Sequence, residues 1–564
     1  MPMESLMTEF DVIVIGGGIN GLTAAAYLSK AGLSTVVIER RDQIGTHAVT
    51  EEQGVPGFRM STHATAIMCG FGPVMADLEL DKYGLELSMR REGFAMPFRD
   101  GKVFAPDVWD ANVNYKKWER FSKRDAETFK AINNAAIRNG ILKEYREKVF
   151  SAAPTLDRWD LWMKLFAKLP RMPSDWADMT GFELADHLYE DEHLKAQITT
   201  VANAYGFPPQ EKVTGPQGVV VMSTFSGFAA GQAIGGAHQV PHALFRCIIH
   251  NGGKILQSCE VEKIIIEDGR AKGVILGPSS AYGEKRIIAR KAIVSDLSPV
   301  PTFLHLIGED NLEKGVAQAV KNYDYDWHIL FHTSCMTTAM PRWKSASFDD
   351  GIQKAWAFNL GVESMRDVER TVDQIKAGSV PEPINALGGC FALSMHDKTA
   401  TPEGFHNLQF WSDVPYNLKS GGAEEWDVIK DDIAEKVVRM VEDYSPGFGQ
   451  SVKMRIAVTP LDSYRKNPSA IYGSWAGGPR KPGQLYLDRT FQGCNAPRTP
   501  FKGLYLSNGI WPMSGSVLLD GYVAACEVTA DLGISRPSWW THGANDWIEG
   551  WYKKNQVAVR PIVS

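Results

Sequence analysis

The chain has 564 residues, of which 44% are hydrophobic and 22% are charged, and its formal net charge at pH 7 is -6. This length exceeds what one hydrophobic core supports, so two or more domains are expected. An acidic chain without a basic stripe that includes aromatic residues gives no indication of nucleic acid as a partner. Its seven cysteines are scattered and form no C-x-x-C pair, which argues against a metal site and a disulfide framework.

A cytoplasmic location is expected, because scattered thiols suit a reducing compartment. No apolar run approaches the ~18 residues of a membrane span, and the segment from Met1 to Glu9 is too short for a signal peptide. Residues 156–176 combine tryptophans and other apolar residues with Arg and Lys at the edges. This pattern is typical of a helix in a bilayer interface, and also of a helix buried between domains. Peripheral membrane contact and burial both stay open.

The N-terminal stretch FDVIVIGGGINGLTAAAYLSKAGLSTVVIERR begins at Phe10 and predicts a strand, a helix and a second strand. Residues 12–15 form a β-branched run, as expected for a strand that is buried on both faces. Residues 22–31 are rich in alanine and predict a helix that ends at Gly32. Residues 35–38 predict the next strand, so the chain opens with a βαβ unit.

Glycines at the spacing G-x-G-x-x-G connect the first strand to the helix. The first allows a tight turn, the second lets the backbone approach a pyrophosphate, and the third lets the helix pack closely on the strand. The helix N-terminus offers free N–H groups and about half a positive charge to phosphates. Glu39 follows the second strand, where a carboxylate accepts hydrogen bonds from an adenosine ribose. The predicted dinucleotide-binding residues are Gly16, Gly18, Asn20, Gly21, Glu39 and Arg40.

The residues after Glu39 resemble the run E-x-x-x-x-x-G-G of the flavoprotein amine oxidase and phytoene desaturase superfamily. Gly45 takes the place of the first glycine, whereas Thr46 replaces the second and is followed by His47. The middle of the chain resembles the same superfamily. Two glycines precede a helix, several strands follow, and the backbone around Val261 is implied to pair with the adenine. The corresponding segments are Gly235-Gly236, a helix at 241–250, strands at 254–257, 261–267 and 273–276, and a returning strand at 292–295.

The stretch RTPFKGLYLSNGIWPMSGSVLLDGYVAACEVTADLGI resembles the closing motif of this superfamily. In relatives its turn lies beside the isoalloxazine ring and the ribityl chain. The usual P-G-G-G is Pro512-Met513-Ser514-Gly515 here, and Val517, Leu518 and Leu519 replace small residues. The resemblance implies the further flavin-site residues Gly45, Thr46, Val261, Asn508, Gly509, Gly515, Ser516 and Val517.

The resemblance spans nearly the whole chain and implies an α/β fold. A Rossmann-like FAD-binding domain of the glutathione-reductase type is interleaved with an α+β substrate domain. Only one βαβ unit has the glycine spacing, so FAD is expected as the sole redox cofactor. The implied FAD-binding domain comprises 1–110, 215–310 and 485–545, the substrate domain comprises 111–214 and 311–484, and a C-terminal tail covers 546–564.

Phytoene desaturase-like enzymes pass a hydride from a C–C bond to flavin N5 while a proton leaves the neighbouring carbon. The resemblance therefore implies desaturation of an apolar, isoprenoid-like or alicyclic substrate. His47 and His63 follow the cofactor strand, where a neutral imidazole can take that proton or can bond to backbone instead. Trp511, with Tyr472 or Trp475, can flank the flavin or pack in the core. The candidate catalytic residues are His47, His63 and Trp511, and no metal ligand is predicted.

Other functions of the same fold also stay open. These are a saturase or isomerase, an amine oxidase, and a flavin-binding protein that acts by interaction without turnover. Thr46 and the segment 511–516 add side-chain volume beside the ring, which favours a compact apolar substrate over a long polyene. The sequence does not indicate the electron acceptor (oxygen, a quinone or a redox partner) or the oligomeric state.

Overall fold

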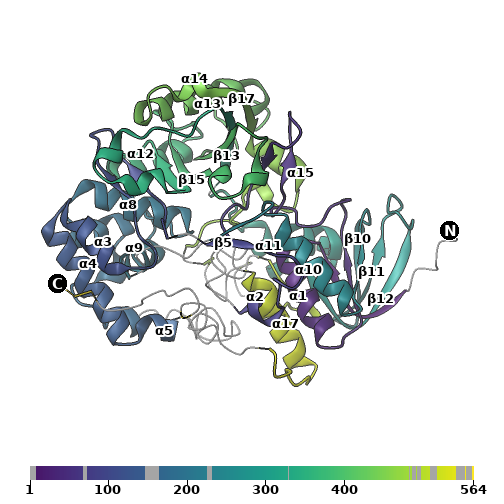
Figure 1. Ribbon diagram of the computed structural model, residues 1–564. Helices are drawn as coiled ribbons and strands as arrows, with labels where there is room; N and C mark the ends of the chain where they lie inside the picture. Colours follow the sequence, from purple (N-terminus) through teal and green to yellow (C-terminus); the bar gives the residue numbers. More distant parts are fainter. Residues whose placement is uncertain are drawn as a thin grey trace.

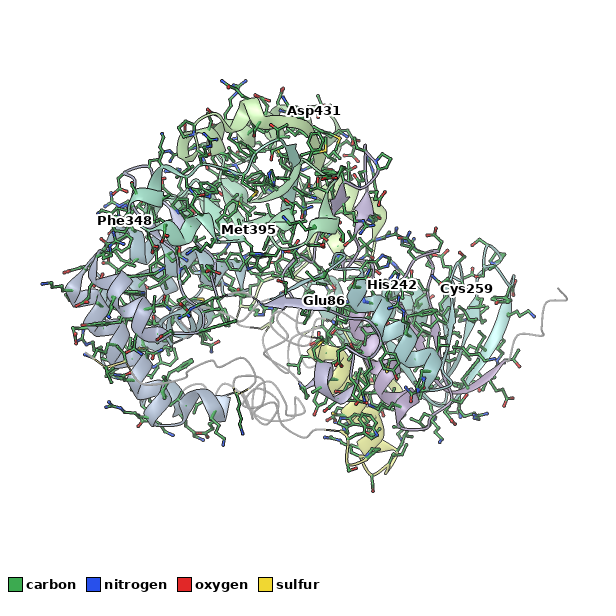
Figure 2. The ribbon with its side chains drawn as sticks, in the orientation of Figure 1. Glu86, His242, Cys259, Phe348, Met395 and Asp431 are labelled. Carbon is green, nitrogen blue, oxygen red and sulfur yellow. The ribbon has the colours of Figure 1, made fainter. Side chains whose placement is uncertain are left out.

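The computed structural model consists of two sheet-centred units and a set of helices beside them (Figure 1). In the view of Figure 1 the seven-stranded sheet lies on the right, the five-stranded sheet at the top and the helices α3, α4, α8 and α9 on the left. Figure 2 shows side chains filling the layers around both sheets. The structure describes residues 8–67, 73–89, 91–145, 164–224, 231–327, 329–481, 483–484, 491, 494, 497–508, 518–540, 553 and 562–563.

The larger sheet has the order β10-β11-β12-β1-β2-β9, with β18 also paired to β12. Strands β9, β2, β1, β12 and β18 are parallel, whereas β10, β11 and β12 form an antiparallel meander. The centre of β1 is apolar and fully buried, as parallel strands covered on both faces require. The bounds are β1 Glu9–Ile15, β2 Thr35–Ile38, β9 Lys254–Leu256, β10 Val261–Glu267, β11 Arg270–Leu276, β12 Lys285–Ser295 and β18 Leu504–Leu506.

Helix α1 (Ile19–Lys30) is buried along almost its whole length between β1, α10 (Gln239–His250) and α17 (Leu519–Asp531). Its neighbours approach its backbone where glycine removes the side chain. A Cβ at Gly21 would lie 2.5 Å from the carbonyl oxygen of Gly16, and a Cβ at Gly521 would overlap with the carbonyl oxygen of Asn20. The alanine-rich sequence of α1 therefore serves close packing as well as helix propensity.

The smaller sheet has the order β14-β15-β16-β13-β17, and all its pairs are antiparallel. Directly paired residues share a face of the sheet. On one face Phe331, Phe358 and Phe410 form an apolar cluster with α13. The opposite face carries Phe391 and Trp411, which look toward the larger unit. The bounds are β13 Leu330–Thr337, β14 Ala357–Leu360, β15 Ala386–Ala392, β16 His406–Asp413, β17 Val452–Val458 and α13 Trp426–Tyr444.

The remaining helices and short strands connect and cover these two units. The helices are α2 Val74–Asp77, α3 Ala111–Glu119, α4 Lys123–Arg138, α5 Ile141–Tyr145, α7 Gly181–Leu188, α8 Glu192–Ala204, α9 Thr214–Thr224, α11 Lys314–Lys321, α12 Met365–Lys376, α14 Phe448–Ser451 and α15 Pro460–Lys466. The short strands are β3 Glu51–Glu52, β4 Arg59–Met60, β5 Leu87–Met89, β6 Met96–Pro97, β7 Val103–Phe104 and β8 Gly231–Ala233.

The described part of the segment 156–176 has buried apolar side chains and exposed polar ones. The main apolar core includes four of these side chains, as a helix buried between domains would require of them: Leu165, Phe166, Leu169 and Trp176. The rest of the segment up to residue 163, with the two other tryptophans of the interface hypothesis, lies outside the described residues. Within the part of the chain that the structure describes, no helix combines the length and apolar character needed to cross a bilayer.

The predicted α/β fold is confirmed, with small differences at element ends. Helix α1 begins at Ile19, three residues before the predicted start, because Gly18 is its N-cap. Strand β12 begins at Lys285, because its first half pairs with β11 before its second half joins β1. The domain boundaries stay a prediction. Strands of the larger sheet fall within 1–110, 215–310 and 485–545, and those of the smaller sheet fall within 311–484.

We expect Gly521→Ala to lower the free energy of unfolding by about 1–3 kcal/mol, because the added methyl group forces α17 away from α1. Gly315→Ala is the control, since this exposed glycine of α11 has no atom within 4 Å of its added Cβ and should gain helix propensity. Chemical denaturation of both variants measures the difference. Equal stability of the two variants would show that the α1–α17 contact adapts freely.

Candidate dinucleotide and substrate site

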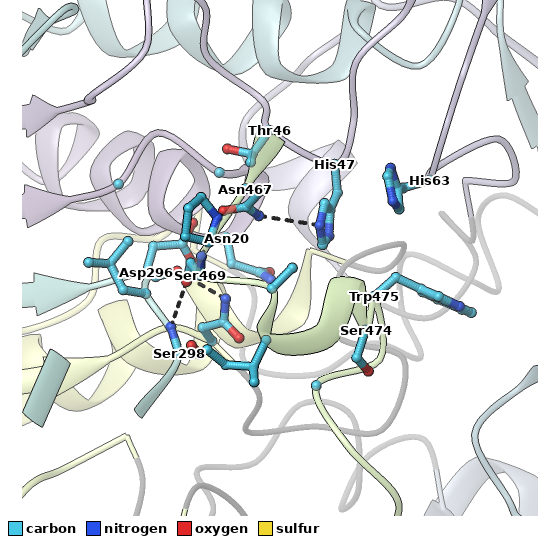
Figure 3. A pocket seen from close by; sticks show the side chains of 18 of the residues that line it. Asn20, Thr46, His47, His63, Asp296, Ser298, Asn467, Ser469, Ser474 and Trp475 are labelled. Carbon is cyan, nitrogen blue, oxygen red and sulfur yellow. Dashed lines mark hydrogen bonds between the residues drawn. The ribbon is translucent and has the colours of Figure 1, made fainter. Parts of the chain in front are cut away.

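One cavity of about 730 Å³ extends from the carboxyl ends of β1, β2 and β12 to the smaller sheet (Figure 3). Its first end is formed by the glycine loop after β1, by Glu39 after β2 and by Val261 at the start of β10. Its other walls come from α8, from the smaller sheet and from the segment 467–477. The cavity therefore joins the predicted dinucleotide site to residues that lie hundreds of positions later.

The Glu39 carboxylate connects the glycine loop to the end of β2. Its Oε2 accepts the N–H of Gly17 at 2.7 Å, and its Oε1 accepts the N–H of Arg41 at 2.8 Å. Glu39 is only 6% exposed, so these two bonds hold a negative charge at the position where a ribose is expected. Gly16 has a φ of 97°, which glycine adopts without strain.

The described residues fit a dinucleotide. The loop has no side chain at Gly16, Gly17 and Gly18, and a Cβ at Gly17 would lie 3.1 Å from Glu39 Oε2. The N-cap of α1 at Gly18 has no side-chain cap, so the helix N-terminus is directed at the cavity. Cys259, Glu260 and Val261 line the cavity where the adenine was expected. These features suit FAD, with Glu39 for the ribose and the loop for the pyrophosphate.

Three imidazole rings form a contiguous group beside the cavity, called the imidazole stack below, in which His47 and His63 are stacked and His332 is tilted against His63. The ring centroids of His47 and His63 are 4.6 Å apart, and those of His63 and His332 are 5.0 Å apart. His63 Nδ1 and Nε2 lie 3.0 Å from the hydroxyl groups of Thr62 and Ser463, respectively. His47 and His63 both line the cavity, and Figure 3 shows their rings side by side; their catalytic roles stay a prediction. Among the described residues, no group of three or more His, Cys, Asp or Glu side chains is placed to hold a metal ion.

The hydrogen bonds of Asn467 assign the tautomer of His47. The N–H of Ser469 donates to Asn467 Oδ1 at 3.2 Å, so the amide nitrogen of Asn467 faces His47 Nε2 at 3.2 Å and donates to it. His47 therefore carries its proton on Nδ1, and its Nε2 lone pair is occupied. A proton can reach Nε2 only if Asn467 turns away or its amide reverses.

Burial keeps these imidazoles neutral. Desolvation, with a smaller contribution from the charge of Lys466, lowers the pKa of His47 to about 4. Desolvation and the neighbouring imidazoles hold the pKa of His63 well below its usual range. Desolvation, followed by His47, lowers the pKa of His332 to about 3. None of these three imidazoles therefore carries a charge at neutral pH.

Several site residues were not found from the sequence. Asp296 and Ser298 follow β12, and Asn467 and Ser469 lie in an Asn-Pro-Ser turn after α15. The end of a parallel strand next to β1 was the one signal that pointed to Asp296. Asn508, which was predicted, donates from Nδ2 to the carbonyl oxygen of Asp296 at 2.9 Å. The predicted residues Gly509, Trp511, Gly515, Ser516 and Val517 lie outside the described residues.

Two of the positions where this chain departs from the family pattern, one a glycine and one a small residue, have left-handed backbones. Thr46 has a φ of 36° and Leu518 has a φ of 59°. Glycine adopts such angles without cost, whereas a residue with a Cβ is strained there by roughly 1–2 kcal/mol. Both residues therefore hold a strained backbone at these positions.

We expect acid to destabilise the protein through its buried histidines. The pKa of His332 is lower in the folded state than in the unfolded chain, so its neutral form stabilises the fold above pH ~6.5 and stability falls as the pH drops toward 3. Between pH 6.5 and pH 5 this group alone should cost about 1.5–2 kcal/mol. Over this interval the His332→Phe variant should lose about 1.5–2 kcal/mol less of its free energy of unfolding than the wild type does. The control variant His187→Gln changes an exposed histidine and should lose as much as the wild type. Urea titrations at both pH values measure it; equal losses in all three proteins would remove His332 from the effect.

Comparison with known proteins assigns the family. The model of the family described as FAD dependent oxidoreductase (DAO) matches residues 11–295, just over half of the chain. A subunit of the limonene dehydrogenase of Castellaniella defragrans is 28% identical over 552 residues, which cover 95% of this chain and 97% of that protein. Pyridine nucleotide-disulfide oxidoreductase domain-containing protein 2 of Rattus norvegicus is 28% identical and covers 93% of this chain and 94% of its own length.

A more distant relative and a solved structure agree with this assignment. The neurosporene-forming phytoene desaturase of Rhodobacter capsulatus is 22% identical, with 79% of this chain and 80% of that protein covered. Cyclohexylamine oxidase from Brevibacterium oxydans shares the fold, with a TM-score of 0.56, 18% identity and coverage of 93% of this chain and 99% of that one. The predicted cofactor, FAD, and the predicted oxidoreductase class are confirmed. With its glycine loop, its ribose carboxylate and its match to the family model, the chain belongs to the FAD dependent oxidoreductase family.

Proposed function

We propose that this protein is a dehydrogenase that desaturates a C–C bond of a compact, apolar substrate of alicyclic or isoprenoid type. The observation that carries the proposal is the uncharged, aromatic wall of the cavity opposite the glycine loop. The relatives named for limonene dehydrogenase and for phytoene desaturase support the same chemistry. The lining residues contributed by α8, its C-cap and the smaller sheet are Val201, Ala204, Tyr205, Asn359, Gly388, Phe391 and Trp411.

A row of rings runs along this wall. Phe94 lies between Tyr205 and Phe391, with centroid distances of 6.1 and 5.8 Å, and Phe391 is 4.7 Å from Trp411. Trp411 in turn lies 5.2 Å from His332, which begins the imidazole stack. Aromatic faces of this kind hold an apolar molecule by area and shape and exclude water from it. No carboxylate from the wall is present among the described lining residues to attract an ammonium group, which disfavours amine oxidation.

FAD supplies the hydride acceptor in this family of reactions. The chain supplies orientation through its aromatic wall and a dry environment through burial. His47 is the one imidazole of the stack that is partly exposed, and we propose it as the proton acceptor. Its Nε2 must first release the hydrogen bond from Asn467, which couples proton acceptance to a rearrangement of the Asn467 side chain.

The proposal is tested by anaerobic reduction of the bound flavin with a panel of candidate substrates. A cyclic monoterpene should bleach the oxidised flavin spectrum, whereas an alkylamine and a forty-carbon polyene should not. His47→Ala should slow this half-reaction at least tenfold with FAD still bound. Reduction by the amine alone would replace the proposal with amine oxidation, and an unchanged rate in His47→Ala would remove His47 from the mechanism.

Thr46 offers a test of the size limit. Thr46→Gly removes both the side chain and the left-handed strain, so we expect a gain of about 0.5–1 kcal/mol in stability after the entropy of the more flexible glycine is deducted. Thr46→Ala is the matched control, because it removes bulk and keeps the strained Cβ. Both variants should accept longer substrates in the flavin-reduction assay, and only the glycine variant should melt at a higher temperature. Equal melting temperatures would show that the φ of Thr46 stores no strain.

A further inference from the structure

Asp296 places a carboxyl group directly on the glycine loop. It follows the last residue of β12, and its N–H donates to the carbonyl oxygen of Ile15 in β1 at 2.8 Å. A Cβ at Gly18 would overlap with Asp296 Oδ2, and a Cβ at Gly21 would lie 3.0 Å from the same atom. The side chain lines the cavity but is only 8% exposed. The carboxyl group therefore lies at the N-terminus of α1, next to the place where a pyrophosphate binds (Figure 3).

The hydrogen bonds of this carboxyl group come from the loop and from β18. The backbone N–H of Gly21 donates to it, and the hydroxyl group of Ser507 donates to Oδ1 at 3.1 Å. Among the residues that the structure describes, no basic side chain forms an ion pair with Asp296. The charged groups that act on it are Glu39 after β2 and Asp520 in the first turn of α17, and both are negative.

This surrounding disfavours the ionised carboxylate. Burial, with the added repulsion of Asp520 and Glu39, raises the pKa of Asp296 well above its usual range. A bound pyrophosphate adds two further negative charges at the same helix terminus. Like charges repel strongly at short distance in a poorly solvated site. A proton on the carboxyl group removes the repulsion and gives it an O–H donor in place of a lone pair.

We propose that Asp296 is a cofactor-binding residue that is protonated whenever FAD occupies the site, and that loss of this proton releases FAD. The proton comes from solvent on binding and returns to solvent on release, and no other bond is made or broken. The inference concerns cofactor binding alone and is independent of the substrate proposed above.

The first experiment measures the dissociation constant of FAD as a function of pH. The holoprotein is diluted at a series of pH values, and free FAD is measured by its fluorescence. Above the pKa of the empty-site carboxyl group, the dissociation constant of the wild type should rise by up to about tenfold per pH unit. Asp296→Asn keeps the shape of the side chain and should bind FAD with little dependence on pH. Asp42→Asn, which removes an exposed charge nearby, should follow the wild type.

The second experiment detects the proton directly and needs no binding measurement. The infrared spectrum of the holoprotein at neutral pH should contain the C=O stretch of a protonated carboxyl group. This band should be absent from Asp296→Asn and present in Asp42→Asn. A wild type that lacks the band, or a pH dependence of FAD binding that Asp296→Asn retains, would overturn the proposal. If Asp296→Asn does not fold, the two measurements on the wild type test the proposal. An FAD dissociation constant that does not change with pH, together with the absence of the carboxyl band, would contradict it. Flavin reduction by substrates is scored separately, so failure here leaves the proposed reaction untouched.

Discussion

The close approach of helix α1 to its neighbours is the constraint on which the rest of the site depends. The helix can meet β1 and α17 at backbone distance only because glycine stands at the contact points, Gly21 and Gly521. This contact brings the N-terminus of α1 to the cavity, where the glycine loop carries no side chain of its own and Asp296 is the neighbouring acid. The bonds of Glu39 to Gly17 and Arg41 then fix the ribose end of the same surface.

The two ends of the cavity differ in their electrostatics, and this division matches the division of labour in a flavoenzyme. The dinucleotide end contains the hydrogen-bonded carboxylate of Glu39, the N-terminus of α1 and the buried side chain of Asp296. The opposite wall is aromatic, and its imidazoles are kept neutral by burial. Charged and polar parts of a large cofactor suit the first end, whereas an apolar molecule suits the second. An ion in the aromatic end would lack both water and a counter-charge.

Strain is located near the expected position of the ring. Thr46 and Leu518 hold left-handed backbones, which strain residues that carry a Cβ. Of these two residues, Thr46 lines the cavity. Its side chain occupies space at the wall where we propose that a compact substrate binds.

Much of the dinucleotide site was predictable from the sequence, because its parts lie within one βαβ unit. The strand, the glycine spacing and Glu39 are separated by fixed short distances, and hydrophobic patterns report burial of the strands. Later strands such as β10 were placed correctly for the same reason. Trp511 and the adjacent flavin-turn residues lie outside the described residues, so their predicted roles stay predictions.

The tertiary structure alone decided which distant side chains share the cavity. The contact between His47 and Asn467 spans 420 residues, and that between His63 and Ser463 spans 400. His332 joins the stack because the pairing of β13 with β16 sets which face of the smaller sheet it occupies. Asp296 reaches the glycine loop because β12 is parallel to β1 and ends beside it. Local sequence patterns determine the helices and strands and which of their side chains are buried. Strand order, register and the electrostatic environment of the site depend on pairings between distant segments, which no local pattern encodes.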